Sequence, residues 1–134
     1  MYIHDLPGSA ATKFIYADDK AYAYQARSLR TISRVLTRDL KLYTEYCRYW
    51  RLVPSESKTV TWSFHLDNGQ ANAELEVTMN EQPVCHDVNP KYLGVTLDCS
   101  LTYRKHLANV TAKVNTRNNI IQKLCHTTWG ADAS

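Results

Sequence analysis

The stretch KFIYADDKAYAY, residues 13–24, decides the fold that this sequence predicts. Two short strand-like runs, residues 13–15 and 21–24, flank the pair Asp18 and Asp19. Alanine and tyrosine alternate in the second run, as expected of a strand whose successive side chains point to opposite faces. No Asn-Gly pair marks a tight turn here. We expect a hairpin with the two aspartates at its tip, and this prediction rests partly on a resemblance described below.

Two carboxylates side by side at a turn repel each other unless a cation compensates them. Magnesium prefers carboxylate oxygens together with substrate phosphates. In nucleotidyl transfer, two such ions clamp the attacking and leaving oxygens. Asp18 and Asp19 are therefore candidate metal ligands. A bare Asp-Asp pair is more often a solvated surface turn, so the surrounding sequence has to decide between these interpretations.

Periodicity outlines the rest of the chain. Apolar residues recur at steps of three and four over residues 26–50, which predicts a helix with Ser28 as N-cap that stops before Pro54. Alternation predicts strands over residues 59–65, 73–79 and 92–97. Turns are expected at residues 67–69 and 80–81, the latter leading into a short strand through residue 84. A second amphipathic helix is expected over residues 103–125. This order of elements predicts an α+β fold.

The 134 residues suit a single domain, and the net charge of +3 is too small to identify a partner. The distribution of charge is more informative. Residues 27–51 hold seven basic and two acidic residues, and residues 100–126 hold five basic and none acidic. Residues 66–98 hold six acidic residues and one basic. Each basic segment can neutralise phosphates or be a solvated helix face.

The four cysteines, Cys47, Cys85, Cys99 and Cys125, fit no zinc-finger spacing. We expect free thiols with no disulfide partner in an intracellular protein, nuclear or cytoplasmic. The adjacent pairs 85–86 and 125–126, each Cys-His, are weak candidates for a shared metal site. No signal peptide and no membrane span are evident, so the protein is not expected to be secreted or to bind a membrane.

The order of several motifs indicates a family. Residues 14–19, FIYADD, resemble the motif C hairpin of reverse transcriptases, and residues 54–59, PSESKT, look like the loop that leads into motif D. Residues 91–98, KYLGVTLD, are similar to the primer-grip strand of non-LTR retrotransposon enzymes. Shorter matches occur at residues 5–7, 101–107, 116–119 and 127–131. The group that the chain resembles most is the jockey-like or RTE-like retroelements.

This resemblance implies an incomplete polymerase palm over residues 1–98, with motifs C, D and E in a mixed antiparallel sheet on which a long helix packs. Residues 99–134 would be the start of the thumb and connection. The implied function is that of a fragment of an RNA-directed DNA polymerase. In the full-length protein it would add dNTPs to a DNA primer on an RNA template by two-metal transfer with Mg²⁺.

The resemblance also assigns roles by position. Asp18 would be the metal-binding carboxylate, with Asp19 in support. Lys58 would lie near the incoming triphosphate as a charge stabiliser or proton donor. The implied nucleic-acid contacts come from the turn, the primer grip and the thumb helix: Tyr16, Ala17, Tyr92, Leu93, Gly94, Lys105, Lys113, Arg117 and Lys123.

Simpler interpretations stand beside these roles. Lys58 has the sequence context of an ordinary surface lysine. Tyr92 and Leu93 are equally typical of strand core. Packing explains the three tryptophans better than base stacking does: Trp50, Trp62 and Trp129. His106 is better explained as a surface helix residue.

The chain departs from the family in several respects, including residues 55–56 in the motif D approach and His126. The family carries a further catalytic aspartate on an earlier strand, and no acidic residue here matches it, so we expect no polymerase activity from this chain alone. Lys20 replaces a usually apolar residue. It either shares a buried face with Tyr22 and Tyr24 or neutralises the aspartates. Two alternatives remain: a non-catalytic RNA- or DNA-binding module, and a non-functional translated pseudogene product of marginal stability.

Overall fold

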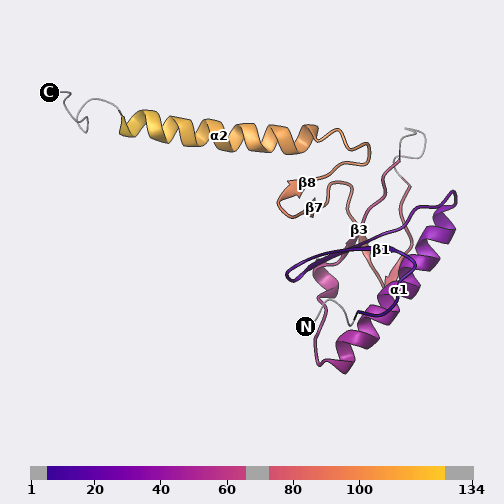
Figure 1. Cartoon of the computed structure of the whole chain (residues 1–134). Helices are drawn as coiled ribbons and strands as arrows, with labels where there is room; N and C mark the ends of the chain where they lie inside the picture. Colours follow the sequence, from indigo (N-terminus) through magenta and orange to yellow (C-terminus); the bar gives the residue numbers. More distant parts are fainter. Residues whose placement is uncertain (1–5, 66–72, 126–134) are drawn as a thin grey trace.

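The computed structural model of the chain describes residues 6–65 and 73–125 (Figure 1). Its elements in chain order are β1 (Thr12–Tyr16), β2 (Asp19–Ala23), α1 (Leu29–Tyr49), the 3₁₀ turn η2 (Glu56–Lys58), β3 (Val60–Thr61), β4 (Thr78–Met79), β5 (Gln82–Pro83), β6 (Cys85–His86), β7 (Lys91–Tyr92), β8 (Val95–Thr96) and α2 (Arg104–Leu124). Helices and strands are thus mixed. The strands pair only two by two within the described ranges, so the assignment to a polymerase palm stays a prediction.

Helix α1 confirms the periodicity of residues 26–50. Ser28 occupies the N-cap position with an extended backbone, although its side chain makes no capping hydrogen bond. At the other end, Arg51 adopts a left-handed φ of +56°, and the Leu52 N–H donates to the Cys47 carbonyl at 2.8 Å. This six-residue closure satisfies a carbonyl that the last helical turn leaves open. The helix therefore ends before Pro54 by its own C-terminal motif.

The β1–β2 hairpin is the predicted hairpin, and it packs on α1. The strands are antiparallel, with Tyr16 opposite Asp19 and Lys13 opposite Tyr22. Alternation turns Tyr22 towards the helix, where its ring centroid lies 6.0 Å from that of Tyr43. The hairpin thus has one face against α1 and one face open.

A buried carboxylate ties the segment before β1 to α1. Asp39, on α1, is 3% exposed. One of its oxygens accepts a hydrogen bond from the Ser9 hydroxyl at 2.5 Å and another from the Ala11 N–H at 2.9 Å. Hydrogen bonds to a charged acceptor are stronger than neutral ones. This contact therefore fixes where β1 begins relative to the helix.

A second segment packs on α1 through alternating apolar side chains. Leu75, Val77 and Met79 are buried, as the pattern of residues 73–79 predicts, although only Thr78–Met79 pairs as strand β4. The Thr78 N–H donates to the Thr37 hydroxyl of α1 at 3.2 Å. Strands β4 and β5 are joined at residues 80–81, the predicted turn, where φ is +50° and +67°. Two left-handed residues in a row are typical of a tight hairpin turn.

Two strand predictions were wrong in detail. The strand expected over residues 92–97 is instead the β7–β8 hairpin, because Leu93 and Gly94 have φ of +47° and +84° and reverse the chain. Of the strand expected over residues 59–65, only Val60–Thr61 pairs, in parallel with β6. The turn predicted at residues 67–69 lies outside the described residues.

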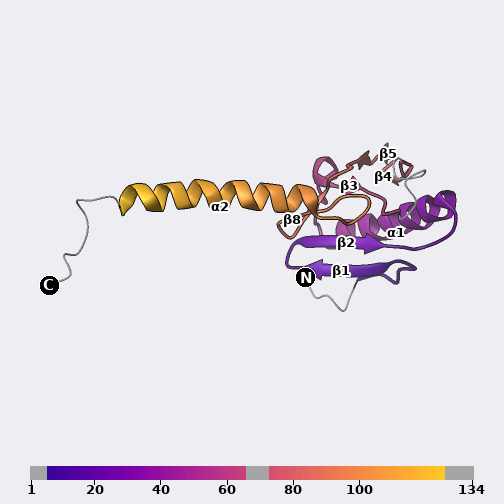
Figure 2. The ribbon, with the colours of Figure 1, turned by 90° about the horizontal axis from the view of Figure 1, so that it is seen from above.

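Helix α2 follows the predicted bounds but extends away from the rest of the chain (Figures 1 and 2). Its first turn is attached to β8, where the Thr96 N–H donates to Nδ1 of His106 at 3.3 Å. His106 is half-buried, and the other α2 residues are exposed. The exposed set includes its predicted apolar face: Leu107, Val110, Val114, Ile121 and Leu124. Neither described helix is long and apolar enough to cross a membrane.

All four cysteines are free thiols. Cys47 is buried on the side of α1 that faces the β1–β2 hairpin, whereas Cys85 and Cys125 are exposed.

The Asp39 contact yields a test. Asp39→Ala removes the carboxylate acceptor shared by the Ser9 hydroxyl and the Ala11 N–H, which keep only their local bonds to each other. The loss of this charged acceptor should lower the free energy of unfolding by about 1–3 kcal/mol. Chemical denaturation followed by circular dichroism measures this. The matched control is Glu45→Ala, an exposed carboxylate on the same helix, which should stay within about 0.5 kcal/mol of the original chain. Equal stabilities for the two variants would contradict the anchoring role.

Candidate active site

The turn that carries the aspartates spans two residues. Tyr16 pairs with Asp19 across the hairpin, so Ala17 and Asp18 form the loop and Asp19 is the first residue of β2. Ala17 has a φ of +53°. The left-handed conformation costs a residue with a Cβ about 1–2 kcal/mol. The turn is therefore tighter than the sequence indicated, and it stores local strain at the residue directly before Asp18.

The open face of the hairpin presents the candidate site to solvent. Asp18 and Asp19 are exposed. Two rings on β1 share the open face with Asp19: Phe14 is 49% exposed and Tyr16 is 67% exposed. A large aromatic next to a carboxylate pair gives this face both an apolar and an anionic part. The aromatic part can contact a base or sugar while the carboxylates hold a cation.

Lys20 lies on the other face, towards α1. It is half-buried, with Nζ 5.6 Å from the centre of the Tyr43 ring and 3.4 Å from the main-chain carbonyl oxygen of Asp18. A cation over an aromatic face is attracted by the ring quadrupole. Of the two alternatives for Lys20, the structure thus supports the face shared with Tyr22. The ammonium is bound to the Asp18 backbone, which leaves both carboxylates free for another cation.

The residues present fit a magnesium ion in part. Asp18 and Asp19 offer oxygen ligands of the kind Mg²⁺ prefers. However, no group of three metal-ligating side chains occurs in residues 6–65 and 73–125. A magnesium ion at this turn would need further ligands from water, phosphate or another segment. Because no such group of three occurs in these ranges, a metal site at the Cys85-His86 pair has no support there. Residue 126, which belongs to the second Cys-His pair, is not described.

Two tyrosines form the support under the turn. Burial raises the pKa of Tyr22 to about 12, with further contributions from Cys47 and Asp39. Burial also raises the pKa of Tyr43, whose hydroxyl is hydrogen-bonded to the Cys47 thiol. Burial thus favours the neutral form of both phenols. The pair therefore acts as packing beneath the hairpin and leaves the charge of the site to Asp18, Asp19 and Lys20.

Lys58 stands at the end of η2, and it is exposed. The turn is bound to the β4–β5 connection, where the Asn80 side-chain amide donates to a Glu56 carboxylate oxygen at 2.5 Å. It is also closed on itself, because the Thr59 hydroxyl donates to the Ser55 carbonyl at 2.7 Å. The described contacts of η2 thus hold Lys58 on a fixed turn, and its role near a triphosphate stays a prediction.

The expected primer-grip residues form the tip of the β7–β8 hairpin. Tyr92 is half-buried, and Leu93 and Gly94 are exposed at the turn. This tip and the β1–β2 turn lie at the same end of the molecule in both views, the end from which α2 departs (Figures 1 and 2). The structure therefore places the two candidate regions at one end without a shared strand.

The basic residues assigned to α2 are all exposed. At about 100° per residue, they fall within about 120° of the helix circumference. The set is Lys105, Lys113, Arg117 and Lys123. They form one side of the helix, next to its exposed apolar side.

Asp98, within the KYLGVTLD motif, organises the connection to α2. Its carboxylate accepts hydrogen bonds from the Ser100, Thr102 and Tyr103 N–H groups and from the Thr102 hydroxyl, at 2.8 to 3.2 Å. The Thr102 N–H contributes most to lowering the pKa of this carboxyl. The bonds stabilise two left-handed residues, Leu101 and Tyr103, directly before the helix.

Sequence reasoning missed the roles of Asp39 and Asp98. Asp39 carried a usable signal, because it lies three and four residues from Leu36 and Tyr43 on the apolar side of α1. An acid in that position has to find a buried partner. Trp50 and Trp62 contact neighbouring rings, Tyr49 and Phe64 respectively, in line with packing roles. Residue 129 is not described.

Comparison with known proteins gives consistent relatives. The chain is 34% identical over 101 residues to a probable RNA-directed DNA polymerase from transposon BS of Drosophila melanogaster. It is 26% identical over 102 residues to the RNA-directed DNA polymerase from mobile element jockey of the same species, and 25% identical over 123 residues to that from transposon X-element. These matches cover 73%, 76% and 87% of this chain. They cover only 11%, 11% and 13% of the relatives.

No family model matches the chain. No solved structure matches it either.

The strain at the turn yields a test. Ala17→Gly removes the Cβ penalty at a left-handed position and should raise the free energy of unfolding by about 1 kcal/mol. Ala23→Gly, at the exposed end of β2 where φ is negative, should instead lower it by about 0.5–1 kcal/mol. Urea unfolding compares the two variants. Destabilisation by both to the same extent would rule out the left-handed turn.

The Tyr22 phenol yields a pH test. Its folded pKa of about 12 exceeds the ordinary value of 10.0. The neutral hydroxyl therefore favours the fold fully below pH 10, and this contribution is lost as the pH rises to about 12. Unfolding free energies measured across this window should fall less steeply for Tyr22→Phe than for the original chain. An equally steep fall in both would show that Tyr22 is not buried as described.

Proposed function

This chain is a relative of the RNA-directed DNA polymerases of non-LTR retrotransposons, and from this premise we propose that it is a segment of such an enzyme. Its β1–β2 turn would be part of the site that adds dNTPs to a DNA primer on an RNA template. The chain spans about a tenth of each relative's length, so the activity of the whole enzyme is part of this proposal.

One observation supports this proposal most strongly. The hairpin brings Asp18 and Asp19 to an exposed two-residue turn, with the neighbouring ammonium of Lys20 directed to the opposite face. A turn with this geometry can present two carboxylates to a solvated cation and to the phosphates of a substrate.

Each group has a definable task in this proposal. Asp18 and Asp19 would hold Mg²⁺, which when bound neutralises phosphate charge and polarises the reacting phosphoryl group. Tyr16 and Ala17 would border the primer end on the open face. Lys58 would stabilise triphosphate charge from its fixed 3₁₀ turn, since a lysine acts on phosphate as a point charge.

The remaining regions would hold nucleic acid. The tip of the β7–β8 hairpin, Tyr92 to Gly94, would contact the primer strand, where glycine allows a close backbone approach. The basic side of α2 would contact the phosphate backbone. In this assignment residues 1–98 are the later part of a palm, and residues 99–134, which include α2, are the start of the thumb and connection.

We further propose that the chain has no polymerase activity by itself. Two carboxylates from one turn supply only part of the ligand set for a pair of metal ions, and the described ranges contain no third group close enough to complete it. The apolar side of α2 and the aromatic residues of the open hairpin face are also exposed. Such surfaces are typical of segments that pack against a larger body.

A chimera tests the proposal. The matching stretch of the jockey polymerase is replaced by residues from this chain, and primer extension on an RNA template is measured with magnesium and dNTPs. The chimera should extend the primer, and Asp18→Asn should reduce extension to background. Glu74→Gln, which removes an exposed carboxylate elsewhere, is the matched control and should retain extension. The purified chain alone should give none.

Two outcomes would contradict the proposal. A chimera that binds template and primer but does not extend them would show that the segment cannot serve in the polymerase site. Extension by the isolated chain, abolished by Asp18→Asn, would show that the ligand set is complete without another segment.

A further inference from the structure

The face of α1 opposite the hairpin carries a line of cations. At about 100° per residue, these side chains fall within about 80° of the helix circumference. They span about 27 Å along the helix at about 1.5 Å per residue. All are exposed: Arg30, Arg34, Arg38, Lys41 and Arg48. We call this set the α1 basic stripe. Glu45 is the one acidic residue of α1 within the same arc.

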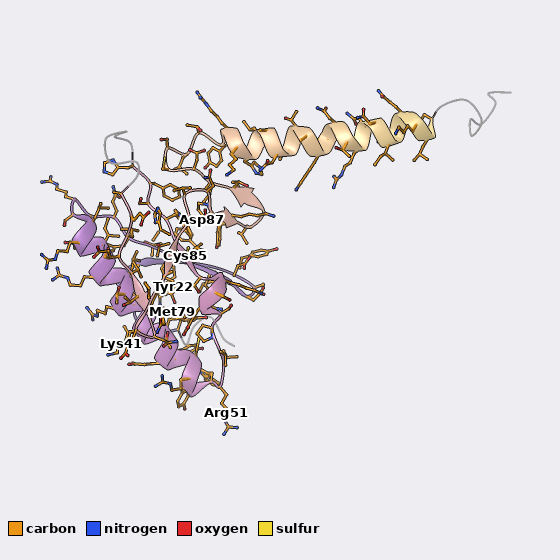
Figure 3. All side chains as sticks on the ribbon, turned by 180° about the vertical axis from the view of Figure 1, so that it is seen from behind. Tyr22, Lys41, Arg51, Met79, Cys85 and Asp87 are labelled. Carbon is orange, nitrogen blue, oxygen red and sulfur yellow. The ribbon has the colours of Figure 1, made fainter. Side chains whose placement is uncertain are left out.

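The stripe is held on a rigid support. The other side of α1 buries Asp39, Thr44 and Cys47 beneath the segments that pack on it. Figure 3 shows Lys41 on the side of α1 away from Tyr22 and Met79. The cations are thus fixed in a row by the packing of the helix, and their charged groups remain in water.

The stripe is costly for the helix that carries it. Arg30, Arg34 and Arg38 follow one another at intervals of four residues, and like charges at this spacing destabilise a helix. Acidic residues at the same positions would instead have produced favourable pairs with the remaining cations. A row of like charges that works against local stability is expected where a ligand of opposite charge compensates it.

The N-terminal end of the stripe adds to its positive potential. The first turn of α1 has no acidic residue, and Ser28 makes no side-chain capping bond. The helix dipole at this end therefore has no compensation from these side chains, although the Thr31 N–H donates to the Ser28 carbonyl at 3.0 Å. A hollow of about 350 Å³ lies at this end, lined by Ser28, Arg30, Thr31 and Arg34. The stripe thus ends in a recess that can admit an anionic group.

We propose that the α1 basic stripe binds the sugar-phosphate backbone of a nucleic-acid strand, on a surface separate from the Asp18–Asp19 turn. Phosphates follow one another at regular intervals along a strand, so a straight row of cations can meet several of them at once. The contact is to phosphate, so it is independent of base and sugar.

Two other polyanions fit the stripe less well. A membrane surface would require a continuous apolar face next to the cations for insertion. The apolar residues of α1 are at least half-buried against the fold, except for Tyr49 and Trp50 at its C-terminal end. An acidic protein segment offers carboxylates on flexible side chains without the regular linear spacing of phosphates. Arginine, which accounts for four of the five cations, also pairs with phosphate through two parallel hydrogen bonds.

The test uses the full chain and 15-nucleotide oligouridylate and oligothymidylate with a fluorescent label. Anisotropy at low salt should show both bound with affinities within threefold of each other. Arg34→Gln combined with Arg38→Gln should weaken both at least tenfold. It should also reduce the slope of log affinity against log salt by about 1.4, since each phosphate that is no longer neutralised lowers this slope by about 0.7. Arg51→Gln combined with Arg104→Gln removes the same charge at exposed positions outside the stripe and outside the proposed primer and thumb contacts, and it should change affinity less than twofold.

A second measurement needs no variant. Phenylglyoxal modifies accessible arginines, and mass spectrometry should show Arg34 and Arg38 protected when oligouridylate is bound. Four results would each overturn the proposal. They are unchanged affinity in the stripe variant, no protection of these arginines, a tenfold preference for RNA or DNA, and binding of a 15-residue oligoglutamate as tight as that of oligouridylate. Asp18→Asn should leave protection unchanged, which separates this surface from the polymerase proposal.

Discussion

The buried carboxylate of Asp39 is the contact on which the arrangement of the described chain depends. It accepts hydrogen bonds from Ser9 and Ala11, and so fixes the start of β1 against the middle of α1. Because β1 and β2 are joined by a two-residue turn, fixing one strand also fixes the position of Asp18 and Asp19. An interaction far from the turn in sequence therefore sets where the candidate site lies.

Helix α1 separates two surfaces that have opposite charge. Its buried side supports the hairpin, whose open face presents the aspartates beside Tyr16. Its exposed side carries the α1 basic stripe. The ammonium of Lys20 is the exception, since it lies between hairpin and helix over Tyr43. Because Lys20 packs against α1 and not on the open face, the anionic turn and the cationic stripe lie on different sides of one helix.

Tight turns with left-handed residues recur at the places where candidate function is expected. Ala17 precedes Asp18, and Leu93 with Gly94 forms the tip of the β7–β8 hairpin. Left-handed residues also form structural turns, at Arg51, Asn80, Glu81, Leu101 and Tyr103, where hydrogen bonds or strand pairing hold them. The exposed apolar side of α2 is a third feature in line with the proposal that the chain is a segment of a larger enzyme.

The sequence by itself determined both helices through three-to-four spacing and the two strand runs of the β1–β2 hairpin through alternation, because both are local properties of the chain. The hairpin itself was expected partly from the resemblance of residues 14–19 to motif C. The burial of Leu75, Val77 and Met79 follows from the same alternation. Tertiary structure alone decided the rest. Leu93 adopts a conformation that its residue type disfavours, so the β7–β8 turn was not predictable from periodicity. The partners of Asp39 lie 28 and 30 residues away, and no local pattern encodes a hydrogen bond of that range.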